Sequence, residues 1–248
     1  KKQVTDNFKR IGKFDMPEVL PIIPSKKQYF YRNKLEFTFS SRKWLIAEEF
    51  NGKPADNLNG LGFHLPGMFD RIIDISNCYL QAAPSNKIRL ELRNFCLEQN
   101  YSFYDVKNKE GFMRNLIIRT ASNDQVMVIV VFGENQPENI RKTLQFLSDS
   151  FPEITSLFYT VNPKKNDTIN DLEIKLFNGQ TYITEHIEDL QFRIGPISFY
   201  QTNPEQAALL YHRATEFADL KGDETVYDLY CGTGTITNYV ALHAKKVI

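Results

Sequence analysis

Hydrophobic and polar residues alternate along much of the chain in a way that is typical of half-buried strands. In YRNKLEFTFS, residues 31–40, the apolar side chains fall on one face and most charged ones on the other. Paired runs flanking Pro66–Gly67 and the turn-forming residues 122–124 predict hairpins. Helical spacing occurs at 1–12, 83–99 and 136–152, and further strands are expected at 156–163 and 181–187. The middle of the chain is therefore predicted to be α+β, with antiparallel strands and about two helices.

The pattern changes near residue 192. A strand-like run at 192–204 precedes a predicted helix. The helix is expected to begin with Asn203 as N-cap, Pro204 at its first position and Gln206 three residues after the cap. Gly222 is expected to end it. A strand at 224–230, a glycine turn at 231–235, a helix at 236–244 and a strand from 245 follow. This order is typical of a parallel, doubly wound sheet. We expect a helix and linker at 1–28, an α+β domain at 29–191 and a second domain from 192 to 248.

Charge and cysteine content narrow the possibilities. The 248 residues carry no net charge, but residues 1–53 hold twelve lysines and arginines against six acids. This basic segment is either a footprint for a polyanion or a solvated lysine-rich surface. The three cysteines are far apart and form no CxxC pair, which predicts neither a disulfide framework nor a zinc site and suits a reducing, cytoplasmic setting. We expect no membrane segment, because no apolar run approaches about 20 residues.

The glycine turn is the first candidate for chemistry. Asp228 ends a predicted strand, and Gly232 and Gly234 follow in a D-x-x-x-G-x-G pattern. Thr237 stands where a dinucleotide site would have its third glycine, so the pattern favours another nucleoside ligand. A tight turn without any ligand stays open as the alternative. Gln201, in ISFYQTNP, either bonds a ligand or satisfies loop backbone.

The two motifs follow one another along the chain, as SFYQTN, then a predicted helix, then VYDLYCGTGT. Taken together, they resemble the class I S-adenosylmethionine-dependent RNA (uracil-5-)-methyltransferases of 23S rRNA and tRNA. KQVTDNFKRIG, YRNKLEF, GFHLPGMFDRIIDISNCYL and GFMRNLIIR resemble earlier segments of that family, in the right order along the chain. The resemblance implies an α+β central RNA-binding domain followed by the start of an α/β Rossmann-like class I methyltransferase domain. It also implies that the chain is truncated at both ends.

The resemblance assigns roles to several residues. Gln201 and Tyr230 match contacts to S-adenosylmethionine, and Asp228, Gly232 and Gly234 match the loop around its methionine part. Thr235 stands where many members have Asn. Four cations on predicted strands are candidates for RNA phosphate contacts, with a solvated strand face as the alternative: Arg32, Lys34, Arg114 and Arg119. Tyr29, Phe30 and Tyr31 are candidates for stacking on unpaired bases.

The family's reaction uses a cysteine thiolate that adds to uracil C6 and a glutamate base that removes the C5 proton. Both lie beyond the glycine turn in the family, so these 248 residues are expected to lack catalytic residues and to be inactive alone. Cys231 is expected to be a small buried side chain behind the turn. Cys78 matches the last of four iron–sulfur ligands, and because the other three are absent no cluster or other metal is expected.

The sequence therefore predicts a methyltransferase for C5 of a uridine in structured RNA, and favours 23S rRNA over tRNA. Neither a membrane nor a protein partner is implied. A tRNA uridine-C5 methyltransferase, a class I methyltransferase of proteins or small molecules, and a non-catalytic RNA-binding module remain the alternatives.

Overall fold

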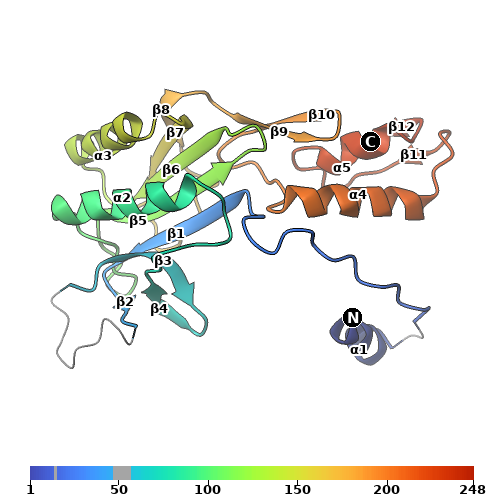
Figure 1. Ribbon diagram of the computed structural model, residues 1–248, viewed down its shortest axis with the longest axis horizontal. Coiled ribbons are helices and arrows are strands. Elements are labelled where there is room, and N and C mark those ends of the chain that lie inside the picture. The colour runs from blue at the N-terminus through green and yellow to red at the C-terminus, as the bar shows by residue number, and fades with distance from the viewer. Residues whose placement is uncertain (14–15, 47–56) are drawn as a thin grey trace.

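The computed structural model describes residues 1–13, 16–46 and 57–248, and its central feature is an eight-stranded sheet (Figure 1). Asp15, Glu48, Glu49 and Lys53 of the basic segment lie outside the described residues. The sheet has the order β2-β4-β3-β1-β5-β6-β7-β8. Its strands are β1 (Lys34–Ser40), β2 (Lys43–Trp44), β3 (Gly60–Leu65), β4 (Met68–Ile73), β5 (Met113–Thr120), β6 (Val126–Phe132), β7 (Ile154–Val161) and β8 (Lys175–Gly179).

Both predicted hairpins form: β3 pairs antiparallel with β4, and β5 pairs antiparallel with β6. The sheet is nevertheless mixed, which corrects the expectation of antiparallel strands. β7 lies parallel to β6, and β2 lies parallel to β4. The helix α3 (Pro137–Ser150) connects β6 to β7. A parallel pair needs such a crossover, whereas a short turn can join only antiparallel neighbours.

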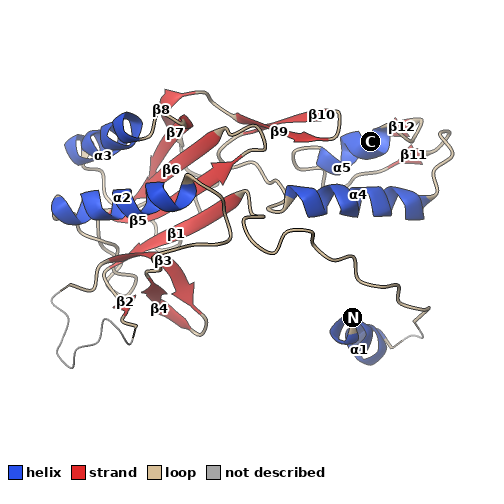
Figure 2. Cartoon of the chain, viewed as in Figure 1, coloured by secondary structure: helices blue, strands red, loops and turns tan. Residues whose placement is uncertain are grey.

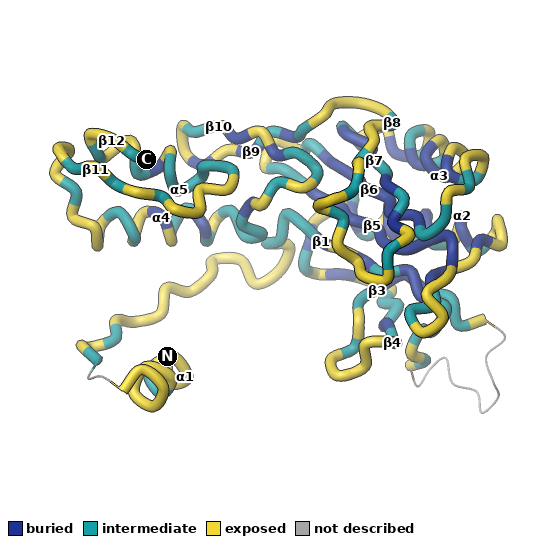
Figure 3. Tube along the Cα trace, turned by 180° about the vertical axis from the view of Figure 1, so that it is seen from behind, coloured by how far each residue is buried: buried dark blue, intermediate teal, exposed yellow. Residues whose placement is uncertain are grey.

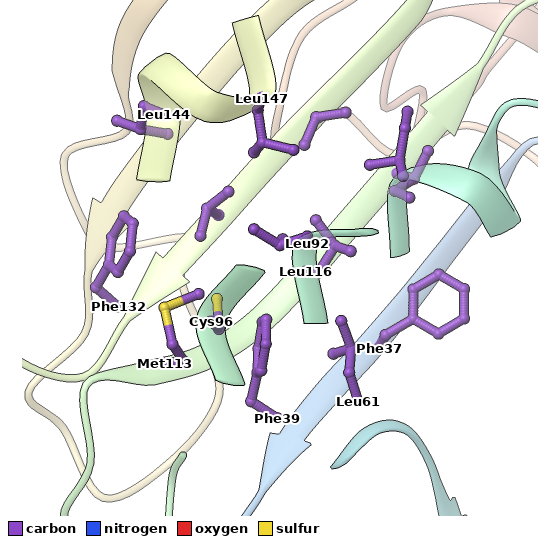
Figure 4. Close-up of a cluster of buried hydrophobic side chains, with 14 of the residues drawn as sticks. Phe37, Phe39, Leu61, Leu92, Cys96, Met113, Leu116, Phe132, Leu144 and Leu147 are labelled. Atoms are coloured by element: carbon purple, nitrogen blue, oxygen red, sulfur yellow. The ribbon is translucent and has the colours of Figure 1, made fainter. Parts of the chain in front are cut away.

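One face of the sheet is covered by α2 (Ser85–Glu98) and α3, at the two positions where the sequence predicts helices. Figure 4 shows side chains of both helices pointing at the strands. The labelled members of this cluster are all buried: Phe37, Phe39, Leu61, Leu92, Cys96, Met113, Leu116, Phe132, Leu144 and Leu147. Burial of this many apolar side chains is the main stabilising contribution to the fold.

The opposite face is covered by the C-terminal part of the chain. The hairpin β9 (Ile183–Ile187) and β10 (Leu190–Ile194) and the helices α4 (Pro204–Ala218) and α5 (Thr235–Ala241) contribute to a second buried cluster. Its members from β6 are Met127, Ile129 and Val131, whereas Val128 and Val130 face the first cluster. Burial on both faces explains why β6 is apolar throughout instead of alternating, and Figure 3 shows the buried stretch in β5 and β6.

The order of elements after residue 192 is as predicted, but the elements are shorter. β10 ends at Ile194, and residues 195–203 form an irregular loop before α4. Asn203 caps α4 by accepting a hydrogen bond from the Gln206 backbone N–H at 3.1 Å, as predicted. The helix ends at Ala218, four residues before Gly222, with Asp219 in the left-handed conformation. β11 (Thr225–Val226) and β12 (Lys246–Val247) form a small parallel sheet, and Figure 2 shows α4 and α5 beside it.

The N-terminal segment contributes little to either core. The predicted helix divides into α1 (Lys2–Asn7) and a π-helical turn η1 (Phe8–Gly12), neither of which has a buried residue. Figure 1 shows this segment apart from the sheet. The following linker contacts α4, because Lys27 pairs with Glu205 at 2.5 Å and the Ile23 carbonyl accepts from Gln206. In the described parts of the chain, helices are too short or too polar to span a bilayer.

Candidate functional site

The two segments singled out by the sequence, the loop that contains Gln201 and the glycine turn, lie together in the fold. The Thr233 hydroxyl donates to the Phe199 carbonyl at 2.9 Å, which joins the turn directly to the loop. A second bond links the turn to α4, because the hydroxyls of Tyr211 and Thr235 lie 2.9 Å apart. Tyr211 is buried in the second cluster. The turn is thus fixed against the loop on one side and against a core tyrosine on the other.

Asp228 shapes the glycine turn from within. Its carboxylate accepts from the Tyr230 backbone N–H at 3.2 Å and from the Thr237 hydroxyl at 2.5 Å. Gly232 and Gly234 have φ values of +54° and +73°, a conformation that a side chain disfavours. Among the described residues beyond its two chain neighbours, the atom nearest to the place of a Cβ at Gly232 is the Tyr230 carbonyl oxygen, at 4.0 Å. The backbone there is open for the approach of a ligand.

Tyr230 presents its ring to solvent. It is 95% exposed, and the preceding Leu229 is 79% exposed. Together with Asp228 and Thr237 it lines a hollow of about 210 Å³. A ring without packing partners provides a flat surface for a heterocycle or for a sulfonium cation. The open glycine backbone, this ring and the nearby carboxylate therefore suit one side of S-adenosylmethionine.

Gln201 lies in a different hollow, of about 330 Å³, between the linker and α4. Its side chain makes no hydrogen bond within the described residues. Its backbone carbonyl accepts from the side-chain amide of Asn33 at 3.0 Å. Gln201 and Tyr230 are thus brought into one region of the fold by the loop and the turn, but they do not line a common hollow.

Arg114 and Arg119 both lie on β5, and both are buried at 1% and 4% exposure. This corrects the expectation that they present charge on a strand face. Arg114 donates to the carbonyls of Asn162, Lys164 and Asn166 at 2.6–2.7 Å. The carbonyls of Pro196 and Ser198 accept from Arg119 at 3.2 and 2.7 Å, and desolvation lowers the pKa of Arg119 to about 10. Both guanidinium groups are occupied with holding loops.

Arg32 and Lys34 remain accessible in part. Arg32 precedes β1 and lines a hollow of about 430 Å³ with Phe30, Tyr31 and several carboxylates. Lys34, at the start of β1, is half-buried opposite Arg119 of β5. Burial, and then the charge of Arg119, lower the pKa of Lys34. Tyr29 and Phe30 are exposed beside Tyr79, with ring centroids 6.0–6.1 Å from it.

The cysteines differ in their environments. Cys78 and Cys96 are buried, but Cys231 is exposed, which corrects the expectation of a buried side chain behind the turn. Desolvation raises the pKa of the Cys96 thiol. Within the described ranges, no three histidines, cysteines or acids come together as metal ligands would.

The most informative contacts of the site could not be read from the sequence. Asn33 and Arg119 bond the loop from the central sheet, and Asn33 is 168 positions from Gln201. No local pattern connects residues so far apart. For the same reason, the role of Thr233 in joining the turn to Phe199 has no signature in the sequence.

A scan against models of known protein families finds no match. A search of solved structures finds the tRNA (uracil-54, C5)-methyltransferase of Pyrococcus abyssi, which was solved in complex with S-adenosyl-L-homocysteine. The likeness has a TM-score of 0.70 at 26% identity and covers 96% of this chain and 52% of that one. The mixed sheet, its helices and the glycine turn therefore define a methyltransferase-like fold.

Curated sequences agree with the fold. A protein of Bacteroides thetaiotaomicron named an uncharacterized RNA methyltransferase is 51% identical over 251 residues. Proteins with the same name in Porphyromonas gingivalis and Chlorobaculum tepidum are 49% and 36% identical over 253 residues. These homologues are named RNA methyltransferases, which agrees with the resemblance predicted from the sequence. The whole chain is matched, but it spans only about half the length of these relatives, namely 55%, 54% and 52%.

Proposed function

We propose that the whole protein transfers a methyl group from S-adenosylmethionine to C5 of a uridine in structured RNA, with 23S rRNA as its first candidate substrate. The observation that carries the proposal is the hydrogen bond between Thr233 and the Phe199 carbonyl. It joins the glycine turn to the loop of Gln201, the two segments that the family resemblance assigns to the cofactor. A turn that served only to connect a strand to a helix would not need this contact.

S-adenosylmethionine supplies an electrophilic methyl group when it is bound. On this chain, Tyr230 offers an open ring, and the open space beside Gly232 permits close approach of the methionine part. Asp228 holds the turn in shape through Tyr230 and Thr237. The Gln201 amide has no hydrogen bond to another described residue, so it is free to orient a ligand.

Arg32 and Lys34 are the proposed phosphate contacts, because the other two candidate arginines are buried. The exposed rings of Tyr29 and Phe30 lie close to the exposed ring of Tyr79, and the three offer stacking surfaces to unpaired bases. Cations beside exposed rings are typical of surfaces that bind single-stranded RNA. The domain at 29–191 is thus proposed to hold RNA, and the segment 192–248 to hold cofactor.

A tRNA is the second candidate substrate. The observation that favours it is the fold of the Pyrococcus abyssi tRNA methyltransferase, which matches 96% of this chain at a TM-score of 0.70. The sequence resemblance covers both the rRNA and the tRNA enzymes and favours 23S rRNA. The two candidates differ only in the RNA, since the reaction at uracil C5 is the same.

The experiment is methyl transfer by the full-length protein from labelled S-adenosylmethionine to 23S rRNA or to bulk tRNA. Digestion and mass spectrometry of the product should give 5-methyluridine from 23S rRNA, and label in tRNA alone would select the second candidate. Label in protein would favour a protein methyltransferase. RNA binding with a steep salt dependence but no cofactor affinity would indicate a non-catalytic module. The 248 residues tested alone are expected to transfer no methyl group.

A further inference from the structure

We propose that Asn33, immediately before β1, and Arg119 of β5 are positioning residues for S-adenosylmethionine because they hold the loop that carries Gln201. The inference rests on the proposed function, since it assumes that Gln201 contacts the cofactor. It adds a role for the central sheet that is separate from binding RNA. Neither residue lies in the glycine turn or in the loop itself.

Asn33 bonds the loop with both its backbone and its side chain. Its backbone N–H donates to the Thr202 carbonyl at 2.8 Å, and its side-chain amide donates to the Gln201 carbonyl at 3.0 Å. Its own carbonyl accepts from the Thr120 N–H at 2.9 Å, which ties it to the end of β5. Asn33 therefore bridges the sheet to the two residues on which the direction of the Gln201 side chain depends.

Arg119 holds the first part of the same loop. One of its terminal nitrogens donates to the carbonyls of Pro196 and Ser198, at 3.2 and 2.7 Å. The side chain is almost fully buried, and its Nε has no partner within the described residues. A buried charge is costly unless its partners compensate. Here these partners include two loop carbonyls, so the charge and the loop position depend on each other.

The loop has few contacts of its own that could fix it. Within residues 195–203 the bonds are those between Gly195 and Ser198, at 3.0 and 3.2 Å. Regular secondary structure is absent between the end of β10 and the start of α4. The position of Gln201 is therefore set by the burial of the neighbouring Tyr200 in the second cluster and by bonds from outside the loop, those of Asn33, Arg119 and Thr233.

The test uses Asn33→Ala and Arg119→Lys in the full-length protein, with two matched controls. Arg114→Lys changes a second buried arginine of β5, which bonds carbonyls of another loop and the carboxylate of Asp167. Asn178→Ala removes an exposed asparagine whose bond to Ser148 is remote from the site. Asn33→Ala keeps the backbone bond to Thr202, so only the side-chain contact is lost.

Each test variant should raise the dissociation constant for S-adenosylmethionine about fivefold, the effect of one lost hydrogen bond. The dissociation constant for RNA should stay within about twofold, and both control variants should bind cofactor like the wild type. Hydrogen exchange should accelerate at residues 196–202 in the test variants and remain slow in β6. This second readout needs no cofactor, and a general loss of stability would accelerate both segments.

Unchanged cofactor affinity in both test variants would overturn the inference, whether or not the loop exchanges faster. Equal weakening by Arg114→Lys would overturn it too, because the effect would then be one of general stability. If the wild type binds RNA but no S-adenosylmethionine, the proposed function fails and the positioning role falls with it. Cofactor binding that weakens in step with faster exchange at 196–202 supports the inference, even if the RNA substrate proves to be different.

Discussion

Tyr230 is the single residue whose environment points most directly to a ligand. Its ring is 95% exposed, so it contributes almost nothing to the core. Tyr211 and Tyr239 nearby are both buried and pack with ring centroids 6.1 Å apart. An aromatic side chain that is kept out of an adjacent aromatic core is available to a partner outside the chain.

Replacing the Tyr230 ring should weaken cofactor binding without changing the stability of the fold. Tyr230→Ala should weaken S-adenosylmethionine binding by roughly tenfold, the loss of one stacking or cation–π contact. Its unfolding temperature should stay within about 1 °C of the wild type, because exposed sites contribute little to stability. Calorimetry of binding and of unfolding would measure both quantities. Tyr79→Ala, at an exposed tyrosine away from the turn, is the control, and equal cofactor affinity in Tyr230→Ala and wild type would contradict the assignment.

The two arginines of β5 show where residue-level prediction fails. Their polarity and their place on a strand follow from the sequence, and the structure has both on β5. Their burial does not follow, because it depends on carbonyls of residues 162–166 and 196–198, far along the chain. A charge whose partners are backbone atoms of distant loops looks the same in a sequence as a charge in solvent.

Elements with local signals were predicted well. The cap of α4 is an example, because Asn203, Pro204 and Gln206 lie within four consecutive positions and act on each other. The direction of β7 was not predicted, because strand direction depends on where α3 leads the chain. The apolar sequences of β6 and β7 are compatible with a parallel or an antiparallel pair, so they do not reveal the direction of the strands.

The cap should contribute measurably to the stability of α4. Asn203→Ala removes the acceptor of the Gln206 N–H, and the free energy of unfolding should fall by about 1 kcal/mol. Asn203→Ser keeps an acceptor at this position and should lose a few tenths at most. Urea titration followed by circular dichroism would compare the three proteins. If alanine and serine destabilise equally, the hydrogen bond to Gln206 is not the source of the effect.

At the scale of the whole molecule, the two predicted domains share a core. β10 spans the predicted boundary between residues 191 and 192. Tyr200 and Ala207 on one side of that boundary belong to the same buried cluster as Met127 and Ile129 on the other. The second cluster is therefore continuous across the predicted boundary.

A shared core predicts cooperative unfolding. Circular dichroism and tyrosine fluorescence should report one coincident transition in denaturant, because loss of either part exposes the second cluster. Residues 192–248 expressed alone should show little helix, since α4 and α5 would lose the part of the second cluster that the sheet and β9 contribute. Two separate transitions, or a helical isolated segment, would show that the C-terminal part folds independently of the sheet.

The exposure of Cys231 has a practical consequence for handling the protein. The other two thiols are buried, so oxidants and alkylating reagents reach this one first. The modified atom then lies next to Tyr230, in the turn proposed to contact the cofactor. A preparation kept in air can thus stay folded and lose its affinity for the cofactor. Binding and activity should be measured in the presence of a reductant, so that loss of activity is not caused by oxidation of Cys231.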